Sequence, residues 1–183
     1  MRIVTFVIAL LTLTPLLGAD DTADRAQDEH AKRLEAWRAS KEGQAALKQI
    51  TSPDSRLQLR LVLDKDAPGE FDEIADPSSK EKLHVSKEVL LNEKAFASAS
   101  IVNDDQTHQP NVNATLTEAG GKQMEWVTSR NINRRLAIVF DKTIVMAPTI
   151  RSTIGKAMVI NGGRDGLSKA EAERLVAAIR GDK

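Results

Sequence analysis

Apolar residues are densest between Arg134 and Ile150, where two apolar runs lie back to back. Leu136 to Phe140 is apolar at every position, so this strand must be covered on both faces, as a central strand of a sheet is. The second run, Thr143 to Ile150, follows after a two-residue connection that begins at Asp141. The pattern predicts a buried β-hairpin, and Pro148 limits the pairing of its second strand because proline has no N–H to donate.

A second strand is predicted from Arg56 to Leu63, where leucines occupy every other position. This period of two is typical of a strand with one buried face. The residues from Asp64 to Lys82 are acidic and contain turn formers, and they are predicted to form a loop. Their carboxylates lack the spacing of a calcium-binding loop, so a solvated acidic loop is favoured over a calcium site. Lys82 to Leu91 is predicted to be extended, with Leu83 and Val85 on one side.

Three shorter strands are predicted at Ala99 to Val102, Val112 to Leu116 and Ala157 to Ile160. The first two are joined by the polar stretch from Asn103 to Asn111, which holds two aspartates and His108. Aspartates beside a histidine are compatible with metal binding or acid–base chemistry. The many turn-forming residues favour a plain hairpin tip instead.

Two helices carry clear start signals. Thr117 is a suitable N-cap for a helix from Glu118 to about Ile132, and a glycine pair in its first turn indicates a close backbone contact there. Ser168 and Glu171 form a capping box at the start of the last helix, which Gly181 closes. Together these elements predict an α+β domain in which two helices cover one face of an antiparallel sheet, close to the ferredoxin-like plan.

A leader helix is predicted before this domain. Asp20 to Ile50 is rich in helix formers and is expected to form a helix that is interrupted near Gly43. We therefore expect residues 20–53 to form a helical arm and residues 54–183 to form the domain. The large apolar residues of the arm form no tight stripe, so it is expected to pack loosely or against something outside the chain. An interaction arm that presents Trp37 and a solvated leader helix both fit, and the pattern favours the second.

The first nineteen residues have the pattern of a signal peptide. Arg2 precedes an apolar run that starts at Ile3, and the small residues Gly18 and Ala19 end the segment. The run is shorter than the roughly 20 apolar residues that span a bilayer. Cleavage and a soluble protein outside the cytoplasm, in the periplasm or an equivalent compartment, are expected, with an uncleaved anchor as the alternative.

Composition excludes several classes of function. Among 183 residues, Lys plus Arg and Asp plus Glu number 26 each and aromatic residues make up 3%, which argues against a nucleic-acid partner. Cysteine is absent, so disulfides, thiolate metal sites and a cysteine nucleophile are excluded. No hydrolase or cofactor motif is found, and the three histidines are far apart. The sequence therefore predicts no enzyme, no cofactor and no metal, and a small exported hydrolase is a minor alternative.

Residues around the hairpin and the preceding helix form a recognisable set: Leu116-Thr117-Glu118, Gly120, Lys122, Thr128, Asn131-Ile132, Arg135 to Val139, Asp141, Ala147-Pro148 and Ile150. This set resembles the head subdomain of the first periplasmic domain of SecD/SecDF, the membrane component that assists protein export. The sequence departs from the family at Asn133, where glycine is usual, and at Asp141-Lys142, where Asp-Gly is usual. The departure predicts either a left-handed Lys142 or a longer, bulged connection.

The resemblance implies a non-catalytic binding module outside the cytoplasm, since the apolar helices of a proton-driven motor are not found after Leu17. Its expected partner is a polypeptide or an envelope protein, bound at a sheet edge or in a groove beside the hairpin. The alternative is a structural or assembly subunit that docks through its N-terminal helix. Candidate partner-binding residues are Trp37, Arg130, Arg134 and Arg151. For the arginines, a solvated edge with local ion pairs is the simpler interpretation.

Overall fold

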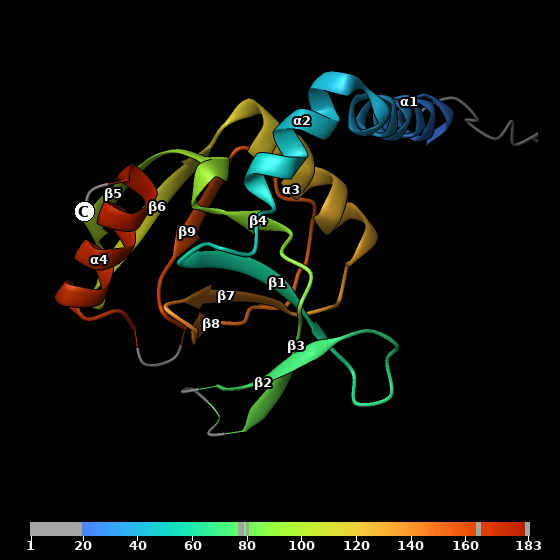
Figure 1. Ribbon diagram of the computed structural model, residues 1–183. Coiled ribbons are helices and arrows are strands. Elements are labelled where there is room, and N and C mark those ends of the chain that lie inside the picture. Colours follow the sequence, from blue (N-terminus) through green and yellow to red (C-terminus); the bar gives the residue numbers. More distant parts are fainter. Residues whose placement is uncertain (1–19, 77–78, 80, 164–165, 182–183) are drawn as a thin grey trace, which may run out of the picture.

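The computed structural model describes residues 20–76, 79, 81–163 and 166–181 (Figure 1). The predicted signal peptide, residues 1–19, lies outside the described residues. Helices and strands follow one another along the chain in this order: α1 (Asp20–Ala39), α2 (Lys41–Ile50), β1 (Leu57–Leu63), β2 (Phe71–Ala75), β3 (Lys82–Ser86), β4 (Leu91–Asn92), the 3-10 turn η1 (Glu93–Ala95), β5 (Phe96–Asn103), β6 (Pro110–Leu116), α3 (Glu118–Arg130), β7 (Leu136–Phe140), β8 (Thr143–Met146), β9 (Ala157–Ile160) and α4 (Lys169–Arg180).

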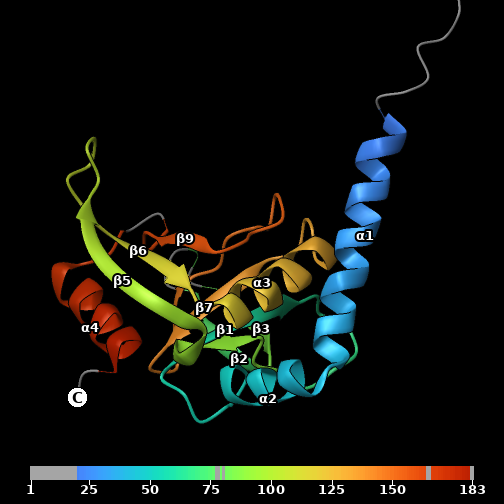
Figure 2. The same cartoon turned by 90° about the horizontal axis from the view of Figure 1, so that it is seen from above.

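The strands divide into two antiparallel sheets, which confirms the α+β class but not the single sheet of the ferredoxin-like plan. One sheet has the order β2-β3-β1-β7-β8, with β4 also paired to β1, and the other has the order β5-β6-β9. The split occurs at η1, where the chain leaves the edge of β1 and enters β5, which pairs with β6. Helix α4 packs on β5 and β6, whereas α3 contacts α1, α2 and β6 (Figures 1 and 2). The buried apolar residues of both helices belong to the main core, together with residues of β1 and β7.

The prediction of a loop throughout residues 64–82 is wrong for β2. This strand pairs with β3 over five positions, among them Ile74 opposite Leu83. Its side chains are exposed except for the half-buried Ile74, so it shows none of the apolar alternation that marks a strand in the sequence. The inward orientation predicted for Leu83 and Val85 is confirmed, because both are buried.

Strand β7 is buried at all five positions, which confirms the predicted cover on both of its faces. Leu136, Ile138 and Phe140 face the main core, while Ala137 and Val139 join a second apolar cluster with residues of β3 and β8. The β2–β3 hairpin folds under the sheet and provides this second cover, and β2 comes into contact with β8. Since β2 and β8 end the order of the first sheet and contact each other, the sheet is strongly curved around the second cluster.

The turn of the β7–β8 hairpin has two residues, Asp141 and Lys142, with φ values of 47° and 65°. Both positive values correspond to a type I′ turn, whose twist matches the right-handed twist of the strands. The left-handed conformation predicted for Lys142 is confirmed, and the longer connection does not form because Phe140 pairs directly with Thr143. Asn133, in the position where the family usually has glycine, is also left-handed, with φ 67°.

The helix signals in the sequence are confirmed. The Thr117 hydroxyl caps α3 by accepting the N–H of Gly120 at 3.0 Å. A Cβ added at Gly120 would lie 2.2 Å from the carbonyl oxygen of Ala95, which is the close contact predicted from the glycine pair. At the other end of the chain, Ser168 forms the expected capping box for α4.

The N-terminal helix bends at Ser40, three residues before the predicted break. Leu47 and Ile50 of α2 are buried in the main core, so the expectation of a loosely packed arm is wrong for this half. A single apolar stripe is expected only of one straight helix. Here the bend turns α2 so that Leu47 and Ile50 reach the main core, while both helices contact α3. Leu34 of α1 is also buried, and Figure 2 shows the start of α1 projecting away from the rest of the molecule.

Candidate functional site

Two grooves flank the β7–β8 hairpin. The β1 groove, of about 820 Å³, lies between β1, β2 and the segment before β1. The β8 groove, of about 710 Å³, lies between β8, the turn after β9 and the first turns of α4. The hairpin thus separates two concave surfaces, and its own residues line both.

The β8 groove follows the outermost strand of the first sheet. Thr143, Ile144 and Val145 are successive residues of β8 and all three line the groove. Within the described residues β8 pairs with β7 on one side and ends the sheet on the other. Opposite the strand, Gly162 and Gly166 line the groove with backbone rather than with large side chains. An end strand that borders an open groove can accept a further extended chain through main-chain hydrogen bonds.

Glycine conformation shapes the wall opposite β8. Gly162 and Gly166 have φ values of 73° and 72°, which favour glycine over other residues. A Cβ added at Gly162 would lie 2.4 Å from the backbone carbon of Gly166. In the sequence these glycines indicate a turn and carry no sign of a binding site.

Asp141 is the centre of an ion-pair cluster at one end of this groove. Its carboxylate accepts hydrogen bonds from Nε and Nη2 of Arg56, at 2.8 and 3.0 Å, and a further hydrogen bond from Arg174. The hydrogen bond from Arg56 is the main cause of the lowered pKa of Asp141, and the charges of Arg56 and Arg174 act in the same direction. The two guanidinium groups also lie 5.2 and 5.3 Å from the ring centre of Phe140. The cluster joins the segment before β1, the hairpin and α4.

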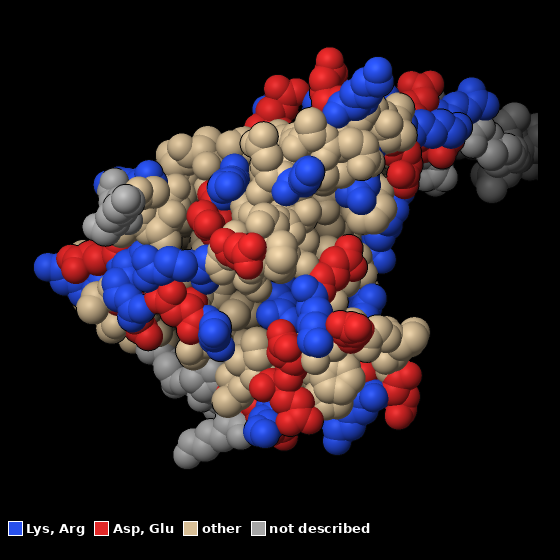
Figure 3. Space-filling model, viewed as in Figure 1, with Lys and Arg blue, Asp and Glu red and all other residues tan. Residues whose placement is uncertain are grey.

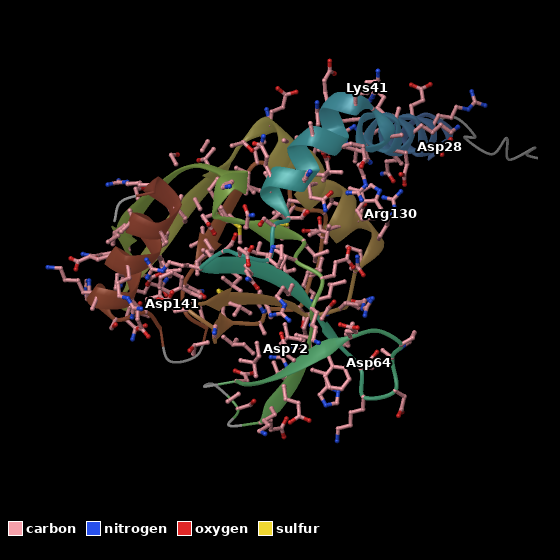
Figure 4. All side chains as sticks on the ribbon, in the orientation of Figure 1. Asp28, Lys41, Asp64, Asp72, Arg130 and Asp141 are labelled. Carbon is pink, nitrogen blue, oxygen red and sulfur yellow. The ribbon has the colours of Figure 1, made fainter. Side chains whose placement is uncertain are left out.

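Charges of both signs meet on this part of the surface. Figure 4 places Asp141 beside α4, and Figure 3 shows acidic and basic side chains interleaved there rather than segregated. Glu171, which also lines the β8 groove, has a lowered pKa because the Ser168 hydroxyl and then its backbone N–H bond to the carboxylate. The groove is therefore lined by the neutral backbone of β8 and of the glycines. The ionised groups beside it, Asp141 and Glu171, already have hydrogen-bond partners.

The β1 groove is built around an arginine that is almost completely buried. Arg60 is 6% exposed. Its guanidinium donates to the carbonyls of Ser86 and Val85 and to the carboxylate of Asp72, the last at 2.5 Å. Arg60 belongs to the polar face predicted for β1, yet it is buried because residues of the β2–β3 hairpin surround its guanidinium. Since its donors serve the fold, the β8 groove is the better candidate for a partner.

The structure places the predicted partner-binding residues in two groups. Trp37 is half-buried on α1, with Lys122 Nζ 5.4 Å from its ring centre, and Arg130 pairs with Glu35 of the same helix. Both residues therefore help to hold α1 on α3. Arg134 and the exposed Arg151 lie on neighbouring segments, near the hydrogen bond that the N–H of Ile150 donates to the carbonyl of Arg134 at 2.8 Å. A role for these four residues in partner binding stays a prediction.

The polar stretch between β5 and β6 forms a hairpin tip. The Asp104 carboxylate accepts the N–H groups of Gln106 and Thr107 at 3.0 and 2.8 Å, and the bond from Thr107 is the main cause of its lowered pKa. These bonds are those of a side-chain-stabilised turn. Within residues 20–76, 79, 81–163 and 166–181, no group of three His, Asp or Glu residues has the arrangement of a metal site.

Comparison with known proteins identifies the family. The sequence family described as SecDF, P1 head subdomain, matches residues 70–183. Protein translocase subunit SecDF of Thermus thermophilus is 40% identical over 77 residues, which cover 41% of this chain and 10% of that protein. Protein translocase subunit SecD of Aquifex aeolicus is 29% identical over 142 residues, or 73% of this chain and 28% of that protein. The chain spans a small part of the length of these relatives.

A solved structure supports the same assignment. The structure of SecDF, a membrane component that enhances protein export, superimposes with a TM-score of 0.53 at 28% identity and covers 91% of this chain and 70% of that one. The fold and the match over most of the chain define an export-component head module. This chain belongs to the SecDF P1 head subdomain family. None of the helices in the described part of the chain is both long and apolar enough to cross a membrane.

Proposed function

We propose that this chain is a non-catalytic module outside the cytoplasm that binds extended polypeptide during protein export, and that the β8 groove is its binding site. Membership of the SecDF P1 head family supports the link to export. The signal-peptide pattern of residues 1–19 supports the location. The single observation that carries the proposed site is β8, which ends the first sheet within the described residues and lines a groove of about 710 Å³.

The groove suits a chain of varied sequence. Main-chain pairing along β8 demands an extended backbone but few particular side chains. The glycines opposite β8 leave room for side chains of different size, and Asp141 and Glu171 are already held by Arg56 and by the Ser168 cap. A site of this kind gives weak, sequence-tolerant binding, because ordering an extended chain costs conformational entropy that a short strand pairing offsets only in part.

Site-specific photocrosslinking tests the proposal. A benzophenone amino acid replaces Val145 in the β8 groove, and a matched variant carries it at Val159, which is 54% exposed on β9 of the other sheet. An unfolded client polypeptide should crosslink strongly to position 145 and weakly to position 159, and the same client in its folded form should crosslink to neither. Equal crosslinking at the two positions would show that the β8 groove is not the site.

An assembly role is the second candidate, because the start of α1 extends beyond the rest of the molecule (Figure 2). In that case α1 would dock the chain onto a larger complex. Since Leu47 and Ile50 belong to the core, a deletion that tests this role must leave α2 intact. Removing residues 20–29 should abolish co-purification with the complex while crosslinking of a client at Val145 persists. If co-purification and client crosslinking both persist after the deletion, the assembly role is excluded.

A further inference from the structure

Helices α1 and α2 are joined by one residue. Ser40 has φ −68° and ψ 157°, an extended conformation that bends a chain otherwise helical from Asp20 to Ile50. The sequence on both sides consists of strong helix formers, so a straight helix is a realistic alternative to the bend. Such a helix of residues 20–50 would be about 46 Å long at the usual rise.

Side chains replace the main-chain hydrogen bonds that the bend removes. The Ser40 hydroxyl donates to the carbonyl of Trp37 at 2.7 Å, and Gln44 Nε2 donates to the carbonyl of Arg38 at 2.6 Å. In a straight helix these two carbonyls would instead accept the N–H groups of residues 41 and 42. Ser40 also caps α2 by accepting the N–H of Gly43 at 3.0 Å. The bent and straight forms thus compete for the same acceptors.

The bend is also sterically tight. A Cβ added at Gly43 would lie 1.9 Å from the carbonyl oxygen of Trp37, so the bent form depends on glycine at this position. A one-residue connection of this kind is the type of joint at which elements exchange between copies.

The seat of α1 on α3 is made by side chains that complement one another. The guanidinium carbon of Arg38 lies 3.6 Å from the ring centre of Trp126, and Trp126 Nε1 donates to the Glu35 carboxylate at 3.0 Å. Glu35 also pairs with Arg130, which Figure 4 shows at the α1 side of α3. Leu34, 5% exposed, is the buried apolar contact of this helix.

This seat is selective for α1. The Trp126 hydrogen bond is the first cause of the lowered pKa of Glu35, and the nearby Arg130 and Arg38 act in the same direction, so the carboxylate is held in its charged form. His30 Nε2 also lies 2.8 Å from a carboxylate oxygen of Glu125 on α3. None of these contacts depends on whether α1 and α3 belong to the same chain.

We propose that α1 is an exchangeable arm. The chain straightens at Ser40, α1 of one copy docks onto α3 of a second copy, and α1 of the second copy docks onto α3 of the first. The partner is therefore another molecule of this chain, related by a two-fold axis. The exchanged dimer keeps the contacts between α1 and α3, whereas the contacts between α1 and α2 change at the two joints and association costs entropy.

Two variants at the joint act in opposite directions. Lys41→Pro favours the bend, because proline suits the first position of α2, and because the residue before a proline prefers the extended backbone that Ser40 already has. Proline in the interior of the straight helix would disrupt it. Ser40→Ala favours the straight form, since the cap is lost and alanine is the best helix former. Lys41→Ala is the matched control for the proline.

The protein is produced through export, so that any processing of the first residues has occurred, and is then refolded at a series of concentrations. Sedimentation equilibrium of these samples measures the fraction of dimer. Loss of a cap changes the equilibrium about fivefold per joint, so Ser40→Ala should raise the dimer association constant about 25-fold. Lys41→Pro should remain monomeric, and Lys41→Ala should behave as the parent. The proposal fails if Lys41→Pro dimerises as Lys41→Ala does, or if parent and Ser40→Ala both remain monomeric.

Mixed crosslinking identifies the interface independently. Because the chain has no cysteine, His30→Cys molecules can be refolded together with Glu125→Cys molecules and treated with a short bismaleimide. Exchange predicts a covalent heterodimer from the mixture and its loss when both chains carry Lys41→Pro. A heterodimer yield that Lys41→Pro leaves unchanged would overturn the proposal. Circular dichroism of each variant confirms that it is folded.

Discussion

Asp141→Asn removes one charge from the cluster that joins the hairpin to α4 and keeps the left-handed turn, since asparagine tolerates positive φ. The carboxylate is 31% exposed and its partners Arg56 and Arg174 are 55% and 57% exposed. Exposed ion pairs contribute about 0.2–1 kcal/mol each, and two such pairs meet here. We therefore expect the substitution to lower the free energy of unfolding by about 1 kcal/mol near neutral pH.

The loss should depend on pH in a defined direction. The pKa of Asp141 is lowered in the folded state, first by the hydrogen bond from Arg56. A lowered pKa means that the carboxylate stabilises the fold above its unfolded pKa, about 3.9, and that this contribution disappears as the pH falls through the folded value. The difference between parent and variant should be complete near pH 7 and should shrink steadily below about pH 4.

Urea denaturation at several pH values, followed by circular dichroism, measures this difference. Asp105→Asn at the exposed tip of the β5–β6 hairpin removes the same charge, and its effect should stay within about 0.5 kcal/mol. A stability difference for Asp141→Asn that stays constant from neutral to acidic pH would refute the assigned ion-pair contribution. So would an effect of equal size in the Asp105 control.

Three further substitutions test the fold around the grooves by the same denaturation assay. Lys142→Gly should stabilise the protein by about 1 kcal/mol, because it removes the cost of a left-handed non-glycine residue; a loss of stability would contradict the turn. Gly120→Ala should destabilise it by about 2–3 kcal/mol through the clash with the carbonyl of Ala95, whereas a neutral effect would show that α3 sits further away. Arg60→Ala should cost about 2 kcal/mol as three acceptors lose a charged donor, and unchanged stability would mean that this guanidinium is solvated.

Sequence patterns predicted the elements whose apolar residues repeat with a clear period. Strands β1 and β7 and helix α4 have such patterns, and the caps at Thr117 and Ser168 marked their helices correctly. The left-handed Lys142 was predicted because a two-residue hairpin turn requires positive φ whatever residue stands there. These features depend on residues that are close together in the sequence, so the sequence alone is enough to predict them.

The features that the sequence missed depend on contacts between distant segments. Strand β2 is exposed and is defined by its pairing with β3, and Arg60 is buried only because that hairpin folds over it. The bend at Ser40 accompanies the packing of Leu47 and Ile50 in the main core, which Leu34 of α1 does not join. The β8 groove likewise needs the turn after β9 beside β8, a juxtaposition that no periodicity indicates.

Pairing of β8 with an extended polypeptide is the main feature of the proposed function. Hydrogen exchange of the backbone amides, with and without an excess of an unfolded client, measures this pairing directly. We expect slower exchange within Thr143–Met146 on addition of the client, and no change within Ala157–Ile160 of the other sheet. Unchanged exchange in β8 under conditions where the client is bound, or protection confined to β9, would contradict it.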